Sequence, residues 1–196
     1  MTRIISGAAG SLRLKGPAKA TRPTSDRVKE SVFAKLDSMG AIAGARVLDL
    51  FAGTGALGLE AASRGAASVT LVEKDSSAAL VCSENLKALQ ASLQKQGYKC
   101  ELKLEKQDVK SFVSKAKAGF DLVFIDPPYD LANQALELLL GEIKSFINAD
   151  SIVVVERDSR STDLLLPKAL SLESRKSYGD TAVFFLVAET MGLDAQ

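Results

Sequence analysis

Hydrophobic positions divide most of the chain into short apolar runs and longer segments with helical spacing. From Arg46 onward the two kinds of segment alternate, and strands that alternate with helices favour a parallel sheet covered by helices on both faces. The predicted strands are Arg46–Phe51, Ser68–Glu73, Cys100–Lys106, Phe120–Asp126 and Ser151–Glu156. The predicted helices are Ala56–Arg64, Ser76–Gln94, Val109–Lys117 and Leu131–Phe146.

The last part of the chain has a different pattern. Two further strand-like runs, Leu170–Lys176 and Thr181–Ala188, flank the turn sequence Tyr178-Gly179-Asp180. Two strands joined by so short a turn predict an antiparallel hairpin. We therefore expect a doubly wound α/β fold with a mostly parallel, seven-stranded sheet that ends in a C-terminal antiparallel hairpin.

The first residues form a smaller unit. Arg3–Ile5 and Leu12–Leu14 flank a Gly-rich stretch and predict a small hairpin, and Thr24-Ser25-Asp26 offers an N-cap for a helix that follows. A unit of this size cannot form its own core, so it should pack on the rest of the chain. The expected organisation is an N-terminal hairpin-plus-helix extension over residues 1–45 and a main domain over residues 46–196.

Composition excludes several classes of protein. Hydrophobic residues make up 46% and charged residues 25% of the chain, as in ordinary soluble domains, yet no apolar run approaches the ~18 residues of a membrane span. The first residues lack the apolar segment of a secretory signal, and the widely spaced Cys82 and Cys100 suit a reducing compartment. The sequence has no histidine, which excludes a histidine base or metal ligand. We expect a cytoplasmic protein without a metal or membrane partner.

Positive charge is concentrated near the N-terminus. The net charge is +1, but residues 1–35 contain eight Lys or Arg against only Asp26 and Glu30. A basic segment on an acidic body favours a polyanionic partner, although a solvated basic arm would give the same pattern. The residues expected to contact such a partner are Arg3, Arg13, Lys15 and Arg22.

A Gly-rich turn lies where the first predicted strand meets the next helix. Gly53, Gly55 and Gly58 match the GxGxxG pattern of dinucleotide sites, in which a helix N-terminus faces a pyrophosphate. The carboxylate of Asp49 at the end of the strand would repel that anion. A ligand that carries an ammonium and a sulfonium group, such as S-adenosylmethionine, would instead be attracted. Asp49 could also simply cap the following turn.

Two more carboxylates follow later strands. Glu73 ends the second predicted strand, where an acid can accept bonds from both ribose hydroxyls, and Asp108 follows the third, where it could accept a bond from an adenine amino group. Either could be a solvated strand end. However, open α/β sheets bind ligands at the carboxyl ends of their strands, and all three acids fall there.

The sequence Asp126-Pro127-Pro128-Tyr129 follows the fourth predicted strand. The prolines fix the backbone and remove two N–H donors, so carbonyl acceptors remain, while Tyr129 offers a flat ring. This set suits a planar base with an exocyclic amino group, whose developing charge the acceptors would stabilise during methylation. A rigid Pro-Pro turn with a packed tyrosine is the alternative interpretation.

Taken together, these motifs resemble the Rossmann-like amino-methyltransferases that use S-adenosylmethionine. The segments Arg3–Gly7, Thr21–Glu30, Val72–Asp75 and Tyr178–Thr181 narrow the resemblance to the RsmD type, the bacterial small-subunit rRNA guanine-N2 methyltransferases. The resemblance implies that Asp126, Pro127, Pro128 and Tyr129 form the catalytic site for the target base. It implies that the cofactor is bound by Asp49, Phe51, Ala52, Gly53, Gly55, Glu73, Lys74, Asp108, Val109, Arg22 and Thr24.

The same resemblance implies methylation of N2 of a guanine in 16S rRNA, at position 966, within a small ribosomal subunit or an assembly intermediate. The residues leave other functions open. A DNA adenine or cytosine amino-methyltransferase would share the Asp-Pro-Pro-Tyr chemistry, and a non-catalytic RNA-binding assembly factor could retain the fold. Arg22 could bind the cofactor carboxylate or an RNA phosphate. A monomer is the default expectation.

Overall fold

The computed structural model describes residues 2–16, 26–116, 119–128, 130–161 and 164–189. The helices are α1 (Asp26–Ser38), α2 (Ala56–Ser63), α3 (Ser76–Lys95), α4 (Val109–Val113) and α5 (Asn133–Ile143). The strands are β1 (Arg46–Leu50), β2 (Ser68–Val72), β3 (Glu101–Glu105), β4 (Phe120–Ile125), β5 (Ile147–Asp158), β6 (Leu170–Tyr178) and β7 (Thr181–Ala188). In this part of the chain no helix is both long and apolar enough to cross a membrane.

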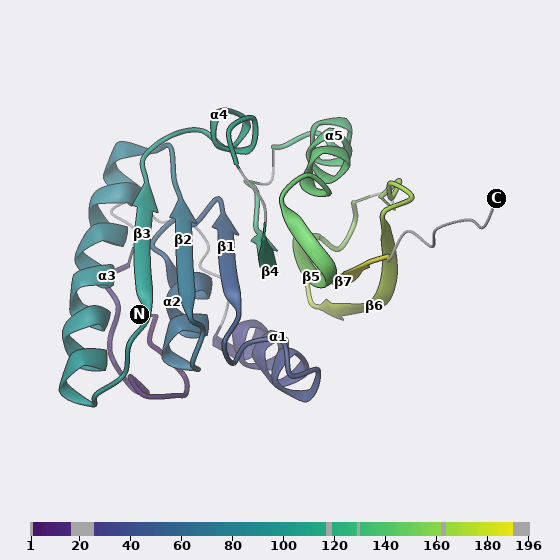
Figure 1. Cartoon of the computed structure of the whole chain (residues 1–196). Coiled ribbons are helices and arrows are strands. Elements are labelled where there is room, and N and C mark those ends of the chain that lie inside the picture. The colour runs from purple at the N-terminus through teal and green to yellow at the C-terminus, as the bar shows by residue number, and fades with distance from the viewer. Residues whose placement is uncertain (1, 17–25, 117–118, 129, 162–163, 190–196) are drawn as a thin grey trace.

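All seven strands belong to one sheet, in the order β3-β2-β1-β4-β5-β7-β6 (Figure 1). The pairs from β3 to β5 are parallel, whereas β7 is antiparallel to both β5 and β6. The order reverses at β1, because the chain first adds β2 and β3 on one side and then β4 on the other. The predicted doubly wound α/β fold with a C-terminal antiparallel hairpin is confirmed.

Helices cover both faces of the sheet, as the alternating side chains of β4 demonstrate. Leu122 and Phe124 belong to one core cluster, which also contains apolar residues of α1, α2 and α3. Val123 and Ile125 belong to the other cluster, together with residues of α4 and α5. Figure 1 shows α4 and α5 above the sheet edge toward which β1, β2 and β3 point. A strand buried on both faces explains why β4 has a continuous apolar sequence.

The strand register brings the predicted site to one edge. Leu50 pairs with Val72 on one side and with Ile125 on the other. The next residues along these three strands, Phe51, Glu73 and Asp126, therefore leave the sheet at the same level. This edge, formed by the carboxyl ends of the parallel strands, is the one at which open α/β sheets bind ligands.

The predicted N-terminal hairpin is present, and the structure differs from the predicted elements around α5 and in β5. The hairpin consists of one antiparallel bridge between Arg3 and Arg13 with backbone bonds from the Ile4 N–H to the Leu12 carbonyl and from the Leu14 N–H to the Thr2 carbonyl (both 2.9 Å). Its backbone also bonds to side chains of α2. Helix α5 begins at Asn133 rather than Leu131, since the segment after Pro128 first closes a turn. Strand β5 extends beyond the predicted Ser151–Glu156 at both ends.

Candidate active site

The Gly-rich turn begins with a residue in an unusual conformation. Phe51, directly after β1, has a φ of 74°, which is sterically costly for a bulky side chain and is typical of functional sites. Gly53 and Gly55 also have positive φ values, of 54° and 85°. The turn is held by bonds from the Ala52 N–H to the Val72 carbonyl (2.9 Å) and from the Gly55 N–H to the Ala52 carbonyl (2.7 Å). These bonds fix the backbone of the turn.

The first and third glycines of the GxGxxG pattern are required for different structural reasons. A Cβ on Gly53 would meet no atom within 4 Å, so this side of the turn is open to a ligand. A Cβ on Gly58 would instead lie 2.4 Å from Cδ2 of Leu71 and 2.9 Å from Cγ1 of Val69. Gly58 therefore allows α2 to pack closely on β2, which is the role of the last glycine in such turns.

Asp49 is almost completely buried beneath this turn. Its side chain is 1% exposed and accepts a bond from the Gly58 N–H (2.9 Å) in the first turn of α2. The pKa of Asp49 is raised to about 7, chiefly by burial and also by the negative charges of Asp126 and Glu73, against the opposing effect of the bond from Gly58. The capping interpretation is therefore correct for one carboxylate oxygen. The register of β1, β2 and β4 brings Asp49, Glu73 and Asp126 to the same edge of the sheet.

Glu73 is oriented by two backbone donors. Its Oε2 accepts from the Gly53 N–H (2.8 Å) and its Oε1 from the Asp75 N–H (2.7 Å). Each oxygen keeps a lone pair, so the half-buried carboxylate can still accept from two hydroxyl donors. Because the same carboxylate fixes the Gly-rich turn, a ligand that binds the turn also meets Glu73. The neighbouring Lys74 side chain is exposed.

Asp108 is the N-cap of α4. Its two carboxylate oxygens accept from the Ser111 N–H (2.9 Å) and the Ser111 hydroxyl (2.6 Å). The hydroxyl bond and then the backbone bond lower the pKa of Asp108, which therefore remains an ionised acceptor. Val109 begins α4 and packs against the second core cluster. The structure thus assigns Asp108 a local capping role that leaves it exposed at the edge of the site.

The Asp-Pro-Pro segment extends β4 beyond the sheet. Asp126 is half-buried, Pro127 is buried and Pro128 is exposed, and the Pro128 carbonyl accepts from the Leu131 N–H (2.9 Å). Tyr129, which the sequence placed in the catalytic set, lies outside the described residues, as do Arg22 and Thr24 of the predicted cofactor set.

Sequence reasoning missed Arg157, which supports this segment from β5. The guanidinium Nη2 donates to the Leu131 carbonyl (3.0 Å) and to Oδ1 of Asn133 (2.7 Å). Arg157 is only 7% exposed, so a buried charge holds the chain that follows the predicted base site. The sequence contains no signal for this contact, because Arg157 resembles any charged residue near the end of a strand.

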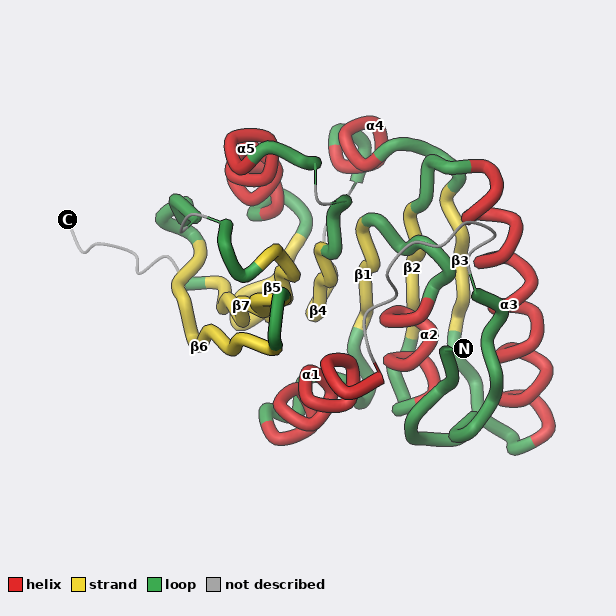
Figure 2. Tube along the Cα trace, turned by 180° about the vertical axis from the view of Figure 1, so that it is seen from behind, coloured by secondary structure: helices red, strands yellow, loops and turns green. Residues whose placement is uncertain are grey.

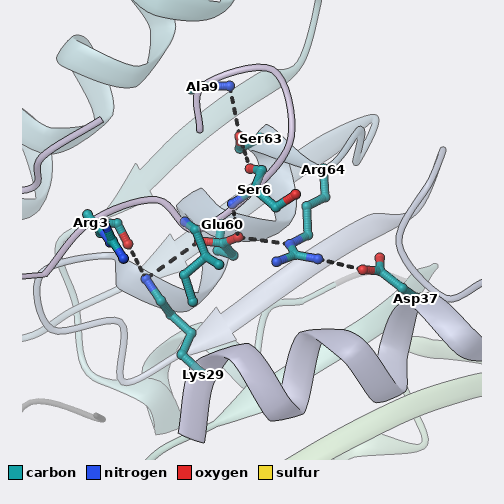
Figure 3. A network of polar contacts seen from close by, with 9 residues as sticks. Arg3, Ser6, Ala9, Lys29, Asp37, Glu60, Ser63 and Arg64 are labelled. Carbon is teal, nitrogen blue, oxygen red and sulfur yellow. Dashed lines mark hydrogen bonds and ion pairs between the residues drawn. The ribbon is translucent and has the colours of Figure 1, made fainter. Parts of the chain in front are cut away.

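A buried polar network at the far end of α2 was also missed (Figure 3). Glu60, which is 0% exposed, accepts from the Ile5 and Ser6 N–H groups (2.7 and 3.0 Å) and from Arg64 Nε (2.8 Å). Lys29 Nζ lies 3.5 Å from the same carboxylate and donates to the Arg3 carbonyl. A charged residue within the apolar sequence of α2 was the available signal.

This network attaches the N-terminal arm, which we define as residues 2–16, to the main domain. Ser63 adds two bonds, since its hydroxyl donates to the Ser6 carbonyl (2.6 Å) and accepts from the Ala9 N–H (2.9 Å). Further along, the arm reaches Asn85 on α3, a buried residue that sequence reasoning also passed over. Its signal was a polar residue on the apolar face that carries Cys82 and Leu89. Figure 2 shows the arm beside α2 and α3.

The predicted RNA-contacting residues of the arm are all exposed. Arg3 and Arg13 face each other across the isolated bridge, which brings two positive side chains to the same surface. Lys15 forms an ion pair with Glu84 (3.0 Å) in which both side chains remain largely accessible. Arg22 lies outside the described residues.

Comparison with known proteins identifies a matching family and similar proteins with known names. The family described as Conserved hypothetical protein 95 matches residues 2–187. YlbH of Bacillus subtilis is 35% identical over 92% of this chain and 96% of its own length. Ribosomal RNA small subunit methyltransferase D of Escherichia coli K12 is 32% identical over 97% of this chain and 91% of its own length. The solved structure of yhhF from Escherichia coli superposes with a TM-score of 0.82 at 30% identity, covering 96% of this chain and 98% of that one.

A more distant structure shares the fold alone. SMU.776, solved in complex with SAH, gives a TM-score of 0.63 at 14% identity over 82% of this chain and 50% of that one. The fold, the Gly-rich turn after β1 and the Asp-Pro-Pro segment after β4 define a Rossmann-like methyltransferase. The chain belongs to the Conserved hypothetical protein 95 family, the family of RsmD, as its motifs indicated.

Proposed function

We propose that this protein transfers a methyl group from S-adenosylmethionine to the exocyclic N2 amino group of a guanine in small-subunit rRNA. The observation that carries the proposal is the cluster of Asp49, Glu73 and Asp126 at the carboxyl edge, next to the Gly-rich turn. Relatives named small subunit rRNA methyltransferase that align with nearly the whole chain support the RNA substrate. Position 966 of 16S rRNA is the proposed target.

The residues at the edge fit S-adenosylmethionine better than a dinucleotide. Asp49, whose pKa is raised by burial and by two neighbouring acids, would be stabilised by a cationic ligand and repelled by a pyrophosphate. Glu73 keeps acceptor capacity for two ribose hydroxyls, and Asp108 remains ionised for an adenine amino group. The cofactor supplies a methyl group on a positively charged sulfur. Phe51, Ala52, Gly53, Gly55, Lys74 and Val109 complete the proposed binding set, with Arg22 and Thr24.

Asp126 and the following prolines form the proposed base site. Their oxygens would accept from the guanine amino group, orient its nitrogen and stabilise the positive charge that develops as nitrogen bonds to the methyl carbon. Once it carries the methyl group, the positively charged nitrogen would be acidic and would give its proton to the Asp126 carboxylate or to water, so no histidine is needed. Arg157 keeps the chain after Pro128 in place through Leu131 and Asn133. Tyr129 would stack on the base.

The N-terminal extension, residues 1–45, is the proposed RNA-contacting and cofactor-closing part, and residues 46–196 form the catalytic domain. Arg3, Arg13, Lys15 and Arg22 would bind RNA phosphates. The target guanine must leave its stack to reach Asp126, so a loop nucleotide is the substrate that costs least. We propose a monomer that acts in the cytoplasm on a small ribosomal subunit or an assembly intermediate.

Nucleoside mass spectrometry tests the proposal directly. The protein is incubated with S-adenosylmethionine and, in parallel, with unmodified small subunits, free small-subunit rRNA and DNA. N2-methylguanosine in the ribosomal RNA is the expected product. Methylated adenine or cytosine in DNA would instead identify a DNA amino-methyltransferase. Intact cofactor binding without methylation of any substrate would favour an RNA-binding assembly factor.

Asp126→Ala separates the proposed base site from the cofactor site. We expect turnover to fall by about 10²–10³-fold, because the acceptor for the amino group is lost from a site of preorganised polar groups. S-adenosylmethionine binding, measured by calorimetry, should remain within about threefold of wild type because the Gly-rich turn and Glu73 are untouched. Loss of cofactor binding together with turnover would contradict this division of roles.

A further inference from the structure

One side-chain amide joins the N-terminal arm to the Gly-rich turn. The Lys15 N–H donates to Oδ1 of Asn85 (2.7 Å), and Nδ2 of Asn85 donates to the Lys15 carbonyl and to the Thr54 carbonyl (both 3.0 Å). Thr54 lies within the turn, between Gly53 and Gly55, whereas Lys15 lies near the end of the arm. Two segments about 40 residues apart in the sequence therefore share one partner.

These three bonds use both N–H donors of the amide and engage its oxygen. Asn85 is 2% exposed, and its oxygen acts as an acceptor while both of its N–H groups act as donors. Among side chains of this size, only asparagine presents an acceptor and two donors in one plane. Substitution would leave the Thr54 carbonyl and both backbone groups of Lys15 without this partner. The residue therefore does more than fill space on the apolar face of α3.

The path of the arm shows which parts of the molecule this contact connects. Near its start the arm is attached to the far end of α2, through Glu60 and Ser63. It then runs beside α2 and α3 toward the Gly-rich turn (Figure 2), and near its end the Lys15 N–H donates to Asn85. The arm is thus anchored at one end to a buried ionic network and at the other to the peptide that precedes Gly55.

We propose that Asn85 is a positioning residue for the cofactor, which holds the Thr54 peptide of the turn and links it to the docked arm. This inference rests on the proposed cofactor site at the Gly-rich turn. The arm that would contact RNA and the turn that would contact S-adenosylmethionine then share one hydrogen-bonded amide. Ordering the turn by the cofactor strengthens the docking of Lys15, and docking of Lys15 strengthens cofactor binding by the same factor.

Calorimetric titration of S-adenosylmethionine into Asn85→Ala and Asn85→Asp tests the proposal. Both variants should bind the cofactor about five- to tenfold more weakly than wild type, as expected for the loss of a bond that holds the site. Asp keeps the acceptor for Lys15 but loses both N–H donors, so it should not rescue binding. With saturating cofactor, kcat should stay within about twofold of wild type, since the base site is untouched.

Ser63→Ala is the matched control. Ser63 is also buried, and it also bridges two backbone groups of the arm, but it does not contact the turn. Its cofactor affinity should remain within about twofold of wild type. Unchanged affinity in a folded Asn85 variant, or equal losses in the Ser63 and Asn85 variants, would overturn the proposal. Glu73→Ala serves as the reference: normal binding by this variant would instead show that the cofactor site itself is misplaced.

A measurement on the wild-type protein keeps the test decisive if neither Asn85 variant folds. Amide hydrogen exchange is compared with and without S-adenosylmethionine. The Lys15 N–H, which donates to Asn85, should become several-fold more protected, whereas the Ser6 N–H, which donates to Glu60, should change little. Equal protection of Lys15 in both states would overturn the link between the arm and the turn.

Discussion

Asp49 and Glu60 are two buried carboxylates whose surroundings differ sharply. Glu60 is bonded to the Ile5 and Ser6 N–H groups and to Arg64, and it lies 3.5 Å from Lys29. Asp49 accepts the Gly58 N–H, and the charges of Asp126 and Glu73 act on it. Asp49, on β1, bonds to Gly58 of α2, and Glu60 lies two residues further along the same helix. The two acids have nearly equal exposure, so their partners account for the difference between them.

The comparison distinguishes the carboxylate of Glu60, which stabilises the fold, from that of Asp49, which we assign to ligand binding. A buried carboxylate is costly unless cations and hydrogen-bond donors compensate it. Around Glu60 the chain supplies these partners itself, and the result is a fixed arm. Within the described part of the chain no lysine or arginine pairs with Asp49. We infer that the cation which completes the surroundings of Asp49 comes with the cofactor.

The largest effect is expected from Glu60→Ala. The substitution leaves Lys29 and two backbone N–H groups buried without their acceptor, and breaking a buried pair in this way costs about 3–5 kcal/mol. Urea unfolding followed by circular dichroism should show a loss of this size in the free energy of unfolding. A double variant, Glu60→Leu with Lys29→Met, removes both charges and should be less destabilised than Glu60→Ala.

A loss below about 1 kcal/mol in Glu60→Ala would contradict the structural role of this charge, because it would mean that water already replaces the network.

Burial lowers the pKa of Lys29 and Glu60 raises it again, so Lys29 should lose its proton more readily in the variant. Stability of Glu60→Ala should therefore recover partly as the pH rises above neutral.

A smaller effect is expected on the pH dependence of cofactor affinity. In the free protein the pKa of Asp49 is raised to about 7, so the carboxyl is mostly protonated at pH 6 and mostly ionised at pH 8. A cationic ligand binds the ionised form, and affinity should therefore rise by about tenfold across this range. Calorimetry at several pH values measures the change.

Asp49→Asn is the matched control for this profile. Asparagine can keep an oxygen acceptor for the Gly58 N–H but cannot ionise. The ratio of wild-type to variant affinity removes the titration of the cofactor's own groups, and this ratio should increase between pH 6 and pH 8. A constant ratio would show that the Asp49 charge plays no part in cofactor binding.

The sequence predicted most of the fold because its hydrophobic pattern changes clearly between strand-like apolar runs and helical spacing. The continuous apolar runs of β4 and β5 and the glycines after β1 fix the sheet and the turn locally, without knowledge of distant residues. The order of acids at strand ends placed Asp49, Glu73 and Asp126 at one edge, since parallel strands share a direction. These features depend on neighbours along the chain, and so they can be read from it.

The contacts that the sequence did not predict are long-range and polar. The bond from Ile5 to Glu60 spans 55 residues, and that from Lys15 to Asn85 spans 70. Periodicity describes which face of a helix is buried but does not indicate which distant backbone will meet a polar residue on that face. For the same reason the sequence indicated the hairpin near Arg3 but not the bonds that its backbone donates to side chains of α2.

The smallest effect on stability, and a clear effect on RNA binding, is expected from Arg13→Ala. Arg13 and Arg3 are exposed and face each other across the bridge, and two like charges in this position are mildly destabilising. The variant should therefore keep its free energy of unfolding within about 0.5 kcal/mol of wild type, in contrast to Glu60→Ala.

If the arm binds phosphates, the slope of log affinity for small-subunit rRNA against log salt should fall by about one in the Arg13→Ala variant. Lys144→Ala removes an exposed cation at the end of α5, on the other face of the sheet, and should leave the slope unchanged. Equal slopes for the Arg13 variant and wild type would remove this part of the arm from the RNA interface and leave it with the structural role that Glu60 defines.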